Sequence, residues 1–340
     1  MKLHTSPWTV LVTGGAGFIG SHLIEHLLWN GVERVVCLDD FNAYYSPARK
    51  RANIAGFVGD SRVTLIEGSF CEEECVEMVF RRHRISHVVH LGAYAGVRPS
   101  IENPAIYQRT NVAGTLTLLE AARRFPVERF LLISSSTVYG KVSAPFLEAM
   151  PLGLPLSPYG ATKRAAELLG LKYADLHAVP VVCLRPFSVY GPRLRPDLVL
   201  SIFCDAIECG RPVPIFGDGT ILRDFTHVSD ICEGLRAALT ARGVIGECIN
   251  LGHAEPFSIR TVVEMLERRL GRRARIEWHP ANPDEMPVTC ADLQKAGTLL
   301  GYSPRVPFAA GLDDYVAWRA QQRRGFGIYE MGKPREFVAA

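Results

Sequence analysis

The chain has 340 residues, of which 48% are hydrophobic and 21% charged, and its formal net charge is +3. This composition is typical of a soluble globular protein with one large domain or two closely associated ones. The charge is too small and too dispersed to indicate a nucleic-acid partner. No apolar run approaches the roughly 18 to 20 residues of a membrane span, and the first residues lack the apolar core of a signal peptide.

Nine cysteines are scattered along the chain without a C-x-x-C pair. Cys71 and Cys75 lie close together, but no second pair exists that would complete a metal site. We therefore expect reduced thiols and a cytoplasmic location. His83, His87 and His90 do not predict a metal site either, because His87 and His90 should face opposite sides of a strand.

The first 185 residues alternate short β-branched segments with longer helical patterns. Strands are predicted at 8–14, 34–40, 62–68, 86–93, 129–136 and 180–186. Helices are predicted at 20–31, at 111–125 and after Pro158. Alternation of this kind predicts an α/β fold, a Rossmann-like doubly wound parallel sheet covered by helices on both faces.

After Pro186, proline and glycine become dense and the regular alternation is lost. We expect a smaller C-terminal region, built partly from loops, at 186–225 and 256–322, with a helix at 258–270. Residues 226–255 are predicted to return to the main sheet and to complete the larger domain with 1–185. The last residues, 323–340, lack apolar periodicity and are expected to form a loosely held tail.

Three glycines, Gly14, Gly17 and Gly20, lie between the first predicted strand and the first predicted helix. Glycines in such a turn let backbone N–H groups approach a pyrophosphate at the positive end of a helix. Asp39 ends the next strand, where a carboxylate can accept hydrogen bonds from the ribose hydroxyls of adenosine. The same carboxylate would repel a 2′-phosphate, so the larger domain is predicted to bind NAD rather than NADP.

Tyr159 and Lys163 stand at helical spacing, where a pair of this kind is often only a surface contact. Other motifs accompany it: the glycine turn, "LDDFN", "HLGA", "TNVAGTLTLLEAA", "SSSTVYG", "LRPFSVYGP", "RDFTHVSD" and "PDEMPVTCAD". These motifs run from Thr13 to about Asp292, most of the chain. With them the chain resembles the extended short-chain dehydrogenase/reductases, in the NAD-dependent nucleotide-sugar epimerase/dehydratase group.

The resemblance implies catalytic roles for a serine-rich strand end and the helix that follows it. Tyr159 would be the general base that takes a proton from a sugar hydroxyl. A free tyrosine titrates near pH 10, and Lys163 and the positive nicotinamide would lower that pKa by stabilising the phenolate. Ser135 would hydrogen-bond the same hydroxyl, and Ser136 is the alternative.

The resemblance also implies a cofactor site, with Asn111 near its nicotinamide end. The site is expected to combine the glycine turn, four strand ends and the catalytic helix, through Gly14, Gly17, Phe18, Ile19, Gly20, Asp39, Asp40, Asn42, Leu91, Ala93, Asn111, Ser134, Tyr159, Lys163 and Pro186. The family often has Asp where this chain has Ser69, so the chain departs from the family at one adenine contact.

The residues before "VYG" bear on the type of reaction. The 4,6-dehydratases of this group carry Asp-Glu within "TDEVYG", for acid and base work at C5 and C6 of the sugar. Here those positions are Ser136 and Thr137, which cannot supply carboxylate chemistry, so dehydration is disfavoured. Removal of hydride from C4 and its return to the opposite face of the ketone would give 4-epimerisation with no further acid or base.

Three stretches, "LDDFNAYYSPARKRAN", "GAYAGVRPSIENP" and "YGPRLRPDLVLSIF", most resemble UDP-glucuronate 4-epimerases. The expected reaction is therefore the conversion of UDP-glucuronate to UDP-galacturonate. Arg195 and Arg98 would meet the hexuronate carboxylate, which suits a guanidinium, and Ser188 would add a hydrogen bond. The remaining nucleotide contacts are expected from Phe216 on the uracil, Arg223 on the diphosphate and Glu285 on the ribose.

The expected 4-keto uronate intermediate is a β-keto acid, which loses CO2 readily when its carboxylate stands perpendicular to the ring carbonyl. We expect Arg195 to hold the carboxylate where that overlap is poor, although contact with a phosphate or with solvent is an alternative for this residue. Alternative enzymes are a UDP-glucuronate decarboxylase of the UDP-xylose synthase type and a 4-epimerase of UDP-glucose or UDP-N-acetylglucosamine. A non-catalytic NAD-sensing regulator is an alternative of another class, although such proteins typically lose the tyrosine–lysine pair. The resemblance further implies a homodimer through the helices that begin near Asn111 and Pro158.

Overall fold

The computed structural model of this chain describes residues 8–281 and 285–325. Its centre is a seven-stranded parallel sheet in the order β10-β6-β5-β4-β1-β2-β3. The strands are β1 (Thr9–Thr13), β2 (Arg34–Asp39), β3 (Val63–Glu67), β4 (His87–His90), β5 (Arg129–Ile133), β6 (Val181–Pro186) and β10 (Cys248–Leu251). The predicted doubly wound parallel sheet is confirmed, and β10 confirms the predicted return of the chain to it.

The strand order reverses direction between β1 and β4. The chain runs outward from β1 through β2 to β3, and then crosses to β4 on the other side of β1. The loops that follow β1 and β4 therefore leave the carboxyl edge of the sheet in opposite directions. In open α/β sheets this point is where ligands bind.

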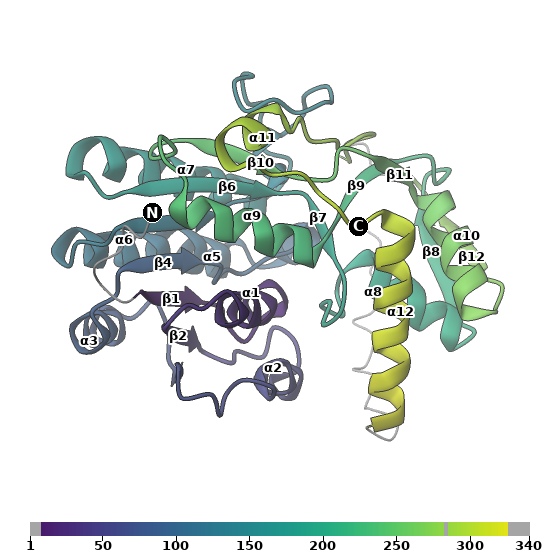
Figure 1. Ribbon diagram of the computed structural model, residues 1–340. Coiled ribbons are helices and arrows are strands. Elements are labelled where there is room, and N and C mark those ends of the chain that lie inside the picture. Colours follow the sequence, from purple (N-terminus) through teal and green to yellow (C-terminus); the bar gives the residue numbers. More distant parts are fainter. Residues whose placement is uncertain (1–7, 282–284, 326–340) are drawn as a thin grey trace.

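Helices cover both faces of the sheet (Figure 1). Along β1, Val10 and Val12 join one buried apolar cluster while Leu11 joins the other, because alternate side chains of a strand point to opposite faces. The first face is covered by α1 (Phe18–Trp29), α9 (Val228–Thr240) and α2 (Pro47–Ile54). The second is covered by α3 (Glu73–His83), α6 (Gly114–Arg124) and α7 (Pro158–His177). Short helices α4 (Val97–Glu102), α5 (Pro104–Tyr107), η1 (Gln108–Ala113) and η2 (Ser136–Tyr139) lie in the connections.

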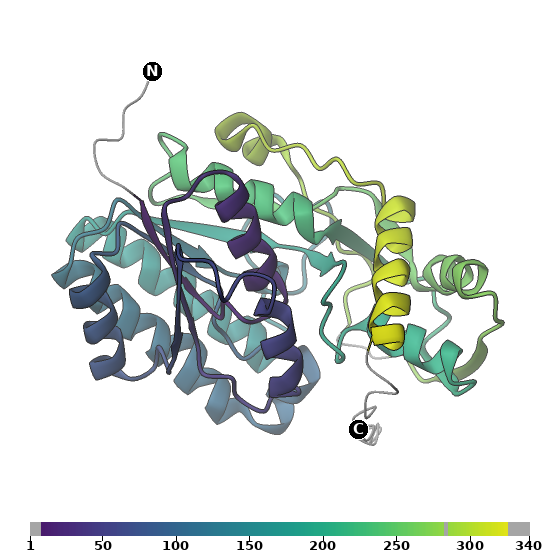
Figure 2. The same ribbon diagram turned by 60° about the horizontal axis from the view of Figure 1, so that its bottom comes forward.

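A smaller lobe lies beyond the carboxyl edge of β6 and carries α12 along its side (Figures 1 and 2). It contains α8 (Val199–Glu208), β8 (Pro212–Phe216), α10 (Ile259–Leu270), β12 (Arg275–His279) and α12 (Phe308–Gly325). Helix α11 (Gln294–Leu300) instead packs against β10 and α9 of the larger lobe. A three-stranded sheet of β7 (Ser188–Tyr190), β9 (Leu222–His227) and β11 (Pro256–Ser258) connects the smaller lobe to the main sheet. The smaller lobe contains more regular secondary structure than its proline content indicates. Pro212 and Pro214 lie in β8, which among the described residues pairs only with β12, so the N–H groups that the prolines lack are not needed on the unpaired edge of the strand.

The domain boundaries stay a prediction. One apolar cluster runs from the sheet face under α1 and α9 into α8, α10 and α12, so the two lobes share a core. The predicted tail is partly helical, since α12 continues to Gly325, and 326–340 lie outside the described residues. Within the described part of the chain, no helix is long and apolar enough to cross a membrane.

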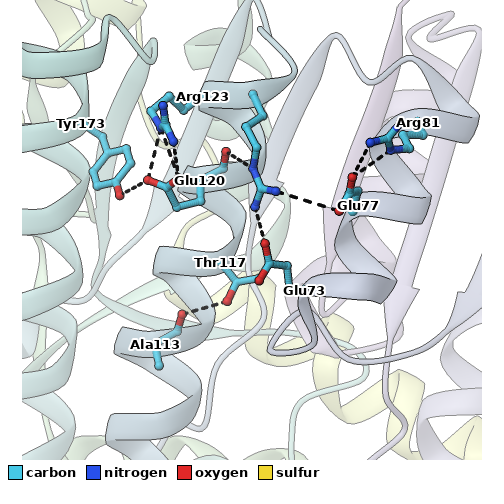
Figure 3. Close-up of polar contacts among 9 residues, drawn as sticks. Glu73, Glu77, Arg81, Ala113, Thr117, Glu120, Arg123 and Tyr173 are labelled. Atoms are coloured by element: carbon cyan, nitrogen blue, oxygen red, sulfur yellow. Dashed lines mark hydrogen bonds and ion pairs between the residues drawn. The ribbon is translucent and has the colours of Figure 1, made fainter.

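Surface ion pairs connect the helices on the second face (Figure 3). Arg124 on α6 lies 2.6 Å from Glu73 and 3.9 Å from Glu77, both on α3. Glu120 on α6 accepts hydrogen bonds from Arg123 and from the Tyr173 hydroxyl on α7. Exposed pairs of this kind contribute little to stability, so the network orients the helices more than it stabilises them.

Breaking the buried ion pair between α7 and β6 is expected to lower the free energy of unfolding by about 3–5 kcal/mol. Glu167 accepts two hydrogen bonds from Arg185, at 2.9 and 2.8 Å, and both side chains are almost fully buried. Glu167→Ala would leave a buried guanidinium without its counterion. Denaturant unfolding measures the effect, and the double variant Glu167→Ala/Arg185→Met should recover most of it. Arg81→Ala, which breaks an exposed pair with Glu77, is the control, with an expected loss below about 1 kcal/mol; a Glu167→Ala protein as stable as this control would contradict the expectation.

Candidate active site at the carboxyl edge of the sheet

The glycine turn after β1 has no room for side chains. Gly14 has a φ of +66°, and a Cβ there would lie 2.9 Å from the Cα of Gly92 in the loop after β4. A Cβ on Gly20 would lie 2.3 Å from the carbonyl oxygen of Gly14. Gly17 caps α1 without a side-chain hydrogen bond, so the first N–H groups of the helix, at Phe18 and Ile19, are available at its positive end. The turn therefore forms a cradle suited to a pyrophosphate.

The end of β2 presents a buried carboxylate. Asp39 accepts hydrogen bonds from the backbone N–H groups of Ala16 (3.1 Å) and Phe41 (2.9 Å), which fix it beside the glycine turn. The ammonium of Lys50 on α2 lies 3.3 Å from Asp39 and 3.8 Å from Asp40. Oδ1 accepts from both Phe41 and Lys50, whereas Oδ2 accepts from Ala16 alone and retains a lone pair for a ribose hydroxyl. Lys50 was not among the predicted site residues, and its charge offsets part of the repulsion that Asp39 would exert on a 2′-phosphate.

Asp40 and Asn42 shape the turn that follows β2. The side-chain amide of Asn42 donates to Asp40 at 2.7 Å, and its side-chain oxygen accepts from the backbone N–H of Tyr44 at 3.1 Å. These bonds hold the segment that carries Tyr44 toward the smaller lobe. Contact of either polar side chain with a cofactor stays a prediction.

Asn111 lies in a π-helical turn, η1, at the start of the long helical segment that leads into α6. Its amide donates to the carbonyl of Tyr94 (2.9 Å) and to the hydroxyl of Thr162 (3.1 Å), and its oxygen accepts from the N–H of Tyr94 (2.9 Å). The side chain therefore ties the loop after β4, which also carries Leu91 and Ala93, to α7. Its predicted place near a nicotinamide stays a prediction, and π-helical turns of this kind are frequent at functional sites.

Tyr159 and Ser135 are brought together where β5 ends and α7 begins. The Ser135 oxygen accepts from the N–H (3.2 Å) and the hydroxyl (2.9 Å) of Thr137, which leaves its own hydrogen for the Tyr159 phenol. Burial raises the pKa of Tyr159, while this hydrogen bond and the positive charge of Arg195 offset part of the increase. Of the two serines left open by the sequence, Ser135 is the one that lowers the pKa of the phenol, and which of them assists Tyr159 in catalysis stays a prediction.

The predicted role of Lys163, to lower the pKa of Tyr159 together with the nicotinamide, stays a prediction. Its ammonium donates to the carbonyl oxygen of Ile133 at 2.8 Å, and burial lowers its pKa to about 8. The groups that lower the pKa of Tyr159 are Ser135 and Arg195, and the contribution of Arg195 was missed. Next to Ile133, the hydroxyl oxygen of Ser134 is buried and has no hydrogen-bond partner among the described residues.

Arg195 lies in the turn before α8 and is already paired. Its Nε and Nη2 donate to the two oxygens of Asp197, at 3.0 and 2.7 Å. The Tyr44 hydroxyl lies 3.1 Å from the same carboxylate and 2.6 Å from the carbonyl oxygen of Ala95. Asp197 and Tyr44 were not predicted as site residues; the "RPD" stretch was noted, but nothing in it signals the contact with Tyr44, because the two residues come from different lobes.

Four other predicted substrate residues form two contacting pairs, Arg98 with Phe216 and Arg223 with Glu285. The guanidinium of Arg98 lies 4.1 Å from the ring centre of Phe216, and His279 stacks on that ring at 5.0 Å. Arg98 is therefore placed with the predicted uracil contact, which differs from its expected place beside the carboxylate. Arg223 pairs with Glu285 at 2.7 Å, so these two predicted residues contact each other.

Ser188 and Pro186 flank the point where the chain leaves the main sheet. Pro186 is the last residue of β6, and Ser188 begins β7, where its side chain is half-buried. Both therefore lie between the sheet edge and the turn that carries Arg195.

No metal site is formed by the described residues, which hold no group of three or more His, Cys, Asp and Glu side chains suited to an ion. His90 is enclosed between the hydroxyls of Thr13 (2.7 Å) and Thr115 (3.0 Å), and burial lowers its pKa to about 3. His90 therefore connects β1 to α6 through these two hydroxyls.

Comparison with known proteins agrees with the geometry. The model of the NAD dependent epimerase/dehydratase family matches residues 10–252. A UDP-glucuronate 4-epimerase from Thermodesulfobacterium geofontis is 39% identical over 309 residues, 91% of this chain and 95% of the relative. The crystal structure of UDP-glucuronic acid 4-epimerase from Bacillus cereus, in complex with UDP-glucuronic acid and NAD, is 39% identical with a TM-score of 0.88, and the match covers 92% of this chain and 99% of that one. A dTDP-glucose 4,6-dehydratase from Streptomyces venezuelae with NAD bound is 29% identical with a TM-score of 0.87, over 94% and 99% of the two chains, so the fold alone does not separate the two reactions.

Proposed function

The chain belongs to the NAD dependent epimerase/dehydratase family, and on that premise we propose that it is a UDP-sugar 4-epimerase that converts UDP-glucuronate to UDP-galacturonate. The observation that supports this substrate most directly is the position of Arg195. Its guanidinium lies over the Tyr44 ring, the Tyr44 and Tyr107 hydroxyls both bind the Ala95 carbonyl, and the Tyr107 ring contacts Tyr159. A guanidinium therefore lies near the proposed base, and its positive charge lowers the pKa of Tyr159.

NAD fits the residues that are present. The cradle of Gly14 and Gly20 excludes side chains, Asp39 is held beside it, and the Ser134 hydroxyl is buried without a partner. The carboxylate favours NAD over NADP, although Lys50 moderates that preference. Bound NAD would accept a hydride from C4 of the sugar and return it to the opposite face of the ketone.

Tyr159 is the proposed general base. As a phenolate it takes the proton of the C4 hydroxyl when the ketone forms, and as a phenol it gives that proton back when the alcohol is restored. Ser135 donates to the phenolate oxygen and so favours the charged form. Lys163, whose ammonium is held by the Ile133 carbonyl, would add a positive charge beneath the site.

The site lacks the acid and base that dehydration requires. Ser136 and Thr137 occupy the positions of the dehydratase carboxylates, and the Thr137 hydroxyl is spent on Ser135. A step at C5 and C6 needs a carboxylate or another strong base there. Epimerisation needs only the proton transfer at C4, which the Tyr159 and Ser135 pair can perform.

The carboxylate of the sugar is the proposed partner of Arg195, with Ser188 as a further donor. In the 4-keto intermediate, breaking the C5–C6 bond would release CO2 and leave the electron pair as an enolate over C4 and C5, which a proton at C5 would convert to a 4-keto pentose. We propose that Arg195 keeps the C5–C6 bond out of alignment with the ring carbonyl, so that the intermediate returns to a hexuronate. The nucleotide end of the site is proposed to be formed by Phe216, Arg98, Arg223 and Glu285. The Arg223–Glu285 pair would separate when Arg223 binds the diphosphate and Glu285 binds the ribose.

Ser135→Ala is expected to move the acid limb of the kcat–pH profile to higher pH, by roughly one unit for one hydrogen bond to a charged group. The base must lose its proton to act, so activity rises as the pH passes its pKa, and removal of a bond to the phenolate raises that pKa further. The other groups around the phenol, Arg195 and Tyr107, are unchanged by the substitution. Ser136→Ala is the control. A shift of the profile in this variant but not in Ser135→Ala would show that Ser136, and not Ser135, assists Tyr159.

Incubation with a panel of UDP-sugars tests the proposed function. We expect UDP-galacturonate from UDP-glucuronate, with little pentose, and slower conversion of UDP-glucose and UDP-N-acetylglucosamine. A pentose as the main product would identify a decarboxylase. A preference for neutral hexoses would show that Arg195 does not select a sugar carboxylate. Failure to convert any of the sugars by a protein that retains NAD, seen in its ultraviolet spectrum, would favour an NAD-sensing regulator.

The proposed assembly is a homodimer formed by α6 and α7. Leu116 on α6 and Leu168 on α7 are exposed apolar side chains on these helices, at 38% and 58%. A second copy would bury them in a four-helix interface. We expect light scattering to give a dimer mass for the wild type and a monomer for Leu168→Glu; an unchanged mass would move the interface elsewhere. All nine cysteines are free thiols, which supports the proposed cytoplasmic location.

A further inference from the structure

The contacts of Arg195 use only one side of its guanidinium. Nε and one hydrogen of Nη2 bind Asp197, and both hydrogen bonds that the structure gives to this arginine end on that carboxylate. An arginine has five N–H donors in a rigid plane. The side formed by Nη1 and the second hydrogen of Nη2 therefore remains for another planar anion, in an orientation that Asp197 sets.

Asp197 is itself anchored to the other lobe. The Tyr44 hydroxyl, from the segment after β2, is shared between Asp197 (3.1 Å) and the carbonyl of Ala95 after β4 (2.6 Å). The Tyr44 ring also lies under the guanidinium, with its centre 5.6 Å from Arg195 Cζ. The close approach depends on Gly96, where a Cβ would lie 2.7 Å from the Tyr44 hydroxyl.

Arg195, Asp197 and Tyr44 together form a clamp, which is charged and largely enclosed. The side chains of Arg195 and Asp197 are 19% and 28% exposed. Although burial raises the pKa of Asp197, the charge of Arg195 and the hydrogen bonds of both clamp partners hold it below its usual range, so the carboxylate is ionised when the enzyme works. A mobile arginine would lose rotamer freedom when it binds substrate, whereas this one is already fixed.

We propose that Asp197 and Tyr44 are positioning residues that present one fixed side of Arg195 to the substrate carboxylate and thereby suppress loss of CO2 from the 4-keto intermediate. This rests on the proposed function, because it assigns a task to Arg195 in the conversion of UDP-glucuronate. Arg195 touches the carboxylate; Asp197 and Tyr44 act through Arg195, across the boundary between the lobes. Their effect is on where the carboxylate is held relative to the ring, which sets the ring pucker and so decides whether the C5–C6 bond stands perpendicular to the plane of the ring carbonyl.

The test compares the pentose-to-epimer product ratio from UDP-glucuronate in Asp197→Asn and Tyr44→Phe. Asparagine keeps the shape but loses the charge, and phenylalanine keeps the ring but loses the hydroxyl tether. We expect the ratio to rise about tenfold in Asp197→Asn, the effect of losing one charge-assisted interaction, and by a smaller factor in Tyr44→Phe. The dissociation constant for UDP, which has no sugar carboxylate, should stay within about twofold of wild type.

The chain offers a matched control for each variant. Asp60 binds Arg62 two residues away with the same donors and the same distances, 3.0 and 2.7 Å, and its side chain is equally accessible at 28%, in a turn that carries none of the proposed site residues. Tyr173 makes a tyrosine–carboxylate contact with Glu120 on the helical surface. Asp60→Asn and Tyr173→Phe should therefore leave the product ratio unchanged.

The outcomes separate this proposal from the proposed function. A wild-type protein that makes no UDP-galacturonate overturns the proposed function itself. If Arg195→Ala changes the product ratio but folded Asp197→Asn and Tyr44→Phe do not, only the clamp is overturned. If Asp197→Asn loses UDP binding to the same degree as sugar conversion, its role is structural and the proposal is also overturned.

Discussion

Replacing Tyr159 by phenylalanine is expected to lower kcat by about 10²- to 10⁴-fold, the usual contribution of a general base. The hydroxyl is the only group lost, because the ring contact with Tyr107, at 6.2 Å between centres, is retained. Ser135 would keep its bonds to Thr137 and would have no phenolate to donate to. Turnover of UDP-glucuronate measures kcat, and the ultraviolet spectrum and the affinity for UDP show whether cofactor and nucleotide still bind.

Tyr173→Phe is the control for this substitution, since it removes a hydroxyl that bonds only a surface carboxylate. Tyr159→Phe is expected to lose kcat while it still binds NAD and UDP, and Tyr173→Phe is expected to retain all three properties. Turnover within about threefold of wild type would show that Tyr159 is not the base, because such a change is far below the effect of general base catalysis. Loss of NAD together with activity would instead indicate a structural role at the start of α7.

Replacing Arg195 by alanine is expected to weaken binding of UDP-glucuronate by about 10- to 100-fold and to divert the reaction toward a pentose. The first effect follows from the loss of a charge-assisted interaction with the carboxylate. The second follows because the ring can then change its pucker until the C5–C6 bond stands perpendicular to the plane of the C4 ketone, where it can break. Calorimetry with UDP-glucuronate and with UDP separates the sugar contribution, and chromatography of the products gives the pentose fraction.

Arg195→Lys separates charge from geometry. Lysine retains the positive charge but has no planar fork, so we expect it to recover much of the affinity while the pentose fraction stays high. A wild-type product ratio and wild-type affinity in Arg195→Ala would instead assign the arginine to solvent or to a phosphate.

The fold was predictable because each strand of the main sheet contains a short run of apolar residues that can be recognised from the sequence. Val10, Leu11 and Val12 are apolar in succession, as expected for a strand buried on both faces, and the glycines after β1 mark where α1 must begin. The smaller lobe was harder to predict. Pro212 and Pro214 favour loops by propensity, yet they form a strand because β12 supplies a partner from more than sixty residues away.

The same distinction holds at the site. Tyr159, Ser135 and Asp39 occur in motifs whose spacing is local, and the structure places them at the sheet edge as expected. Lys50, Tyr44 and Asp197 act through contacts between segments far apart in the chain, such as the one of Tyr44 with Asp197, and nothing in one sequence specifies such a pairing. The pairing of Arg223 with Glu285 and the stacking of Arg98 on Phe216 were missed for the same reason.

The most direct test of the account follows the hydrogen at C4. UDP-glucuronate deuterated at C4 should give UDP-galacturonate that retains the deuterium at C4, and unlabelled substrate in D₂O should give a product without deuterium at C4 or C5. Retention is expected because the hydrogen that leaves C4 returns to the same carbon, while only the hydroxyl proton exchanges through Tyr159. Loss of the label to solvent, or incorporation of solvent deuterium at C5, would contradict the proposed epimerisation at C4.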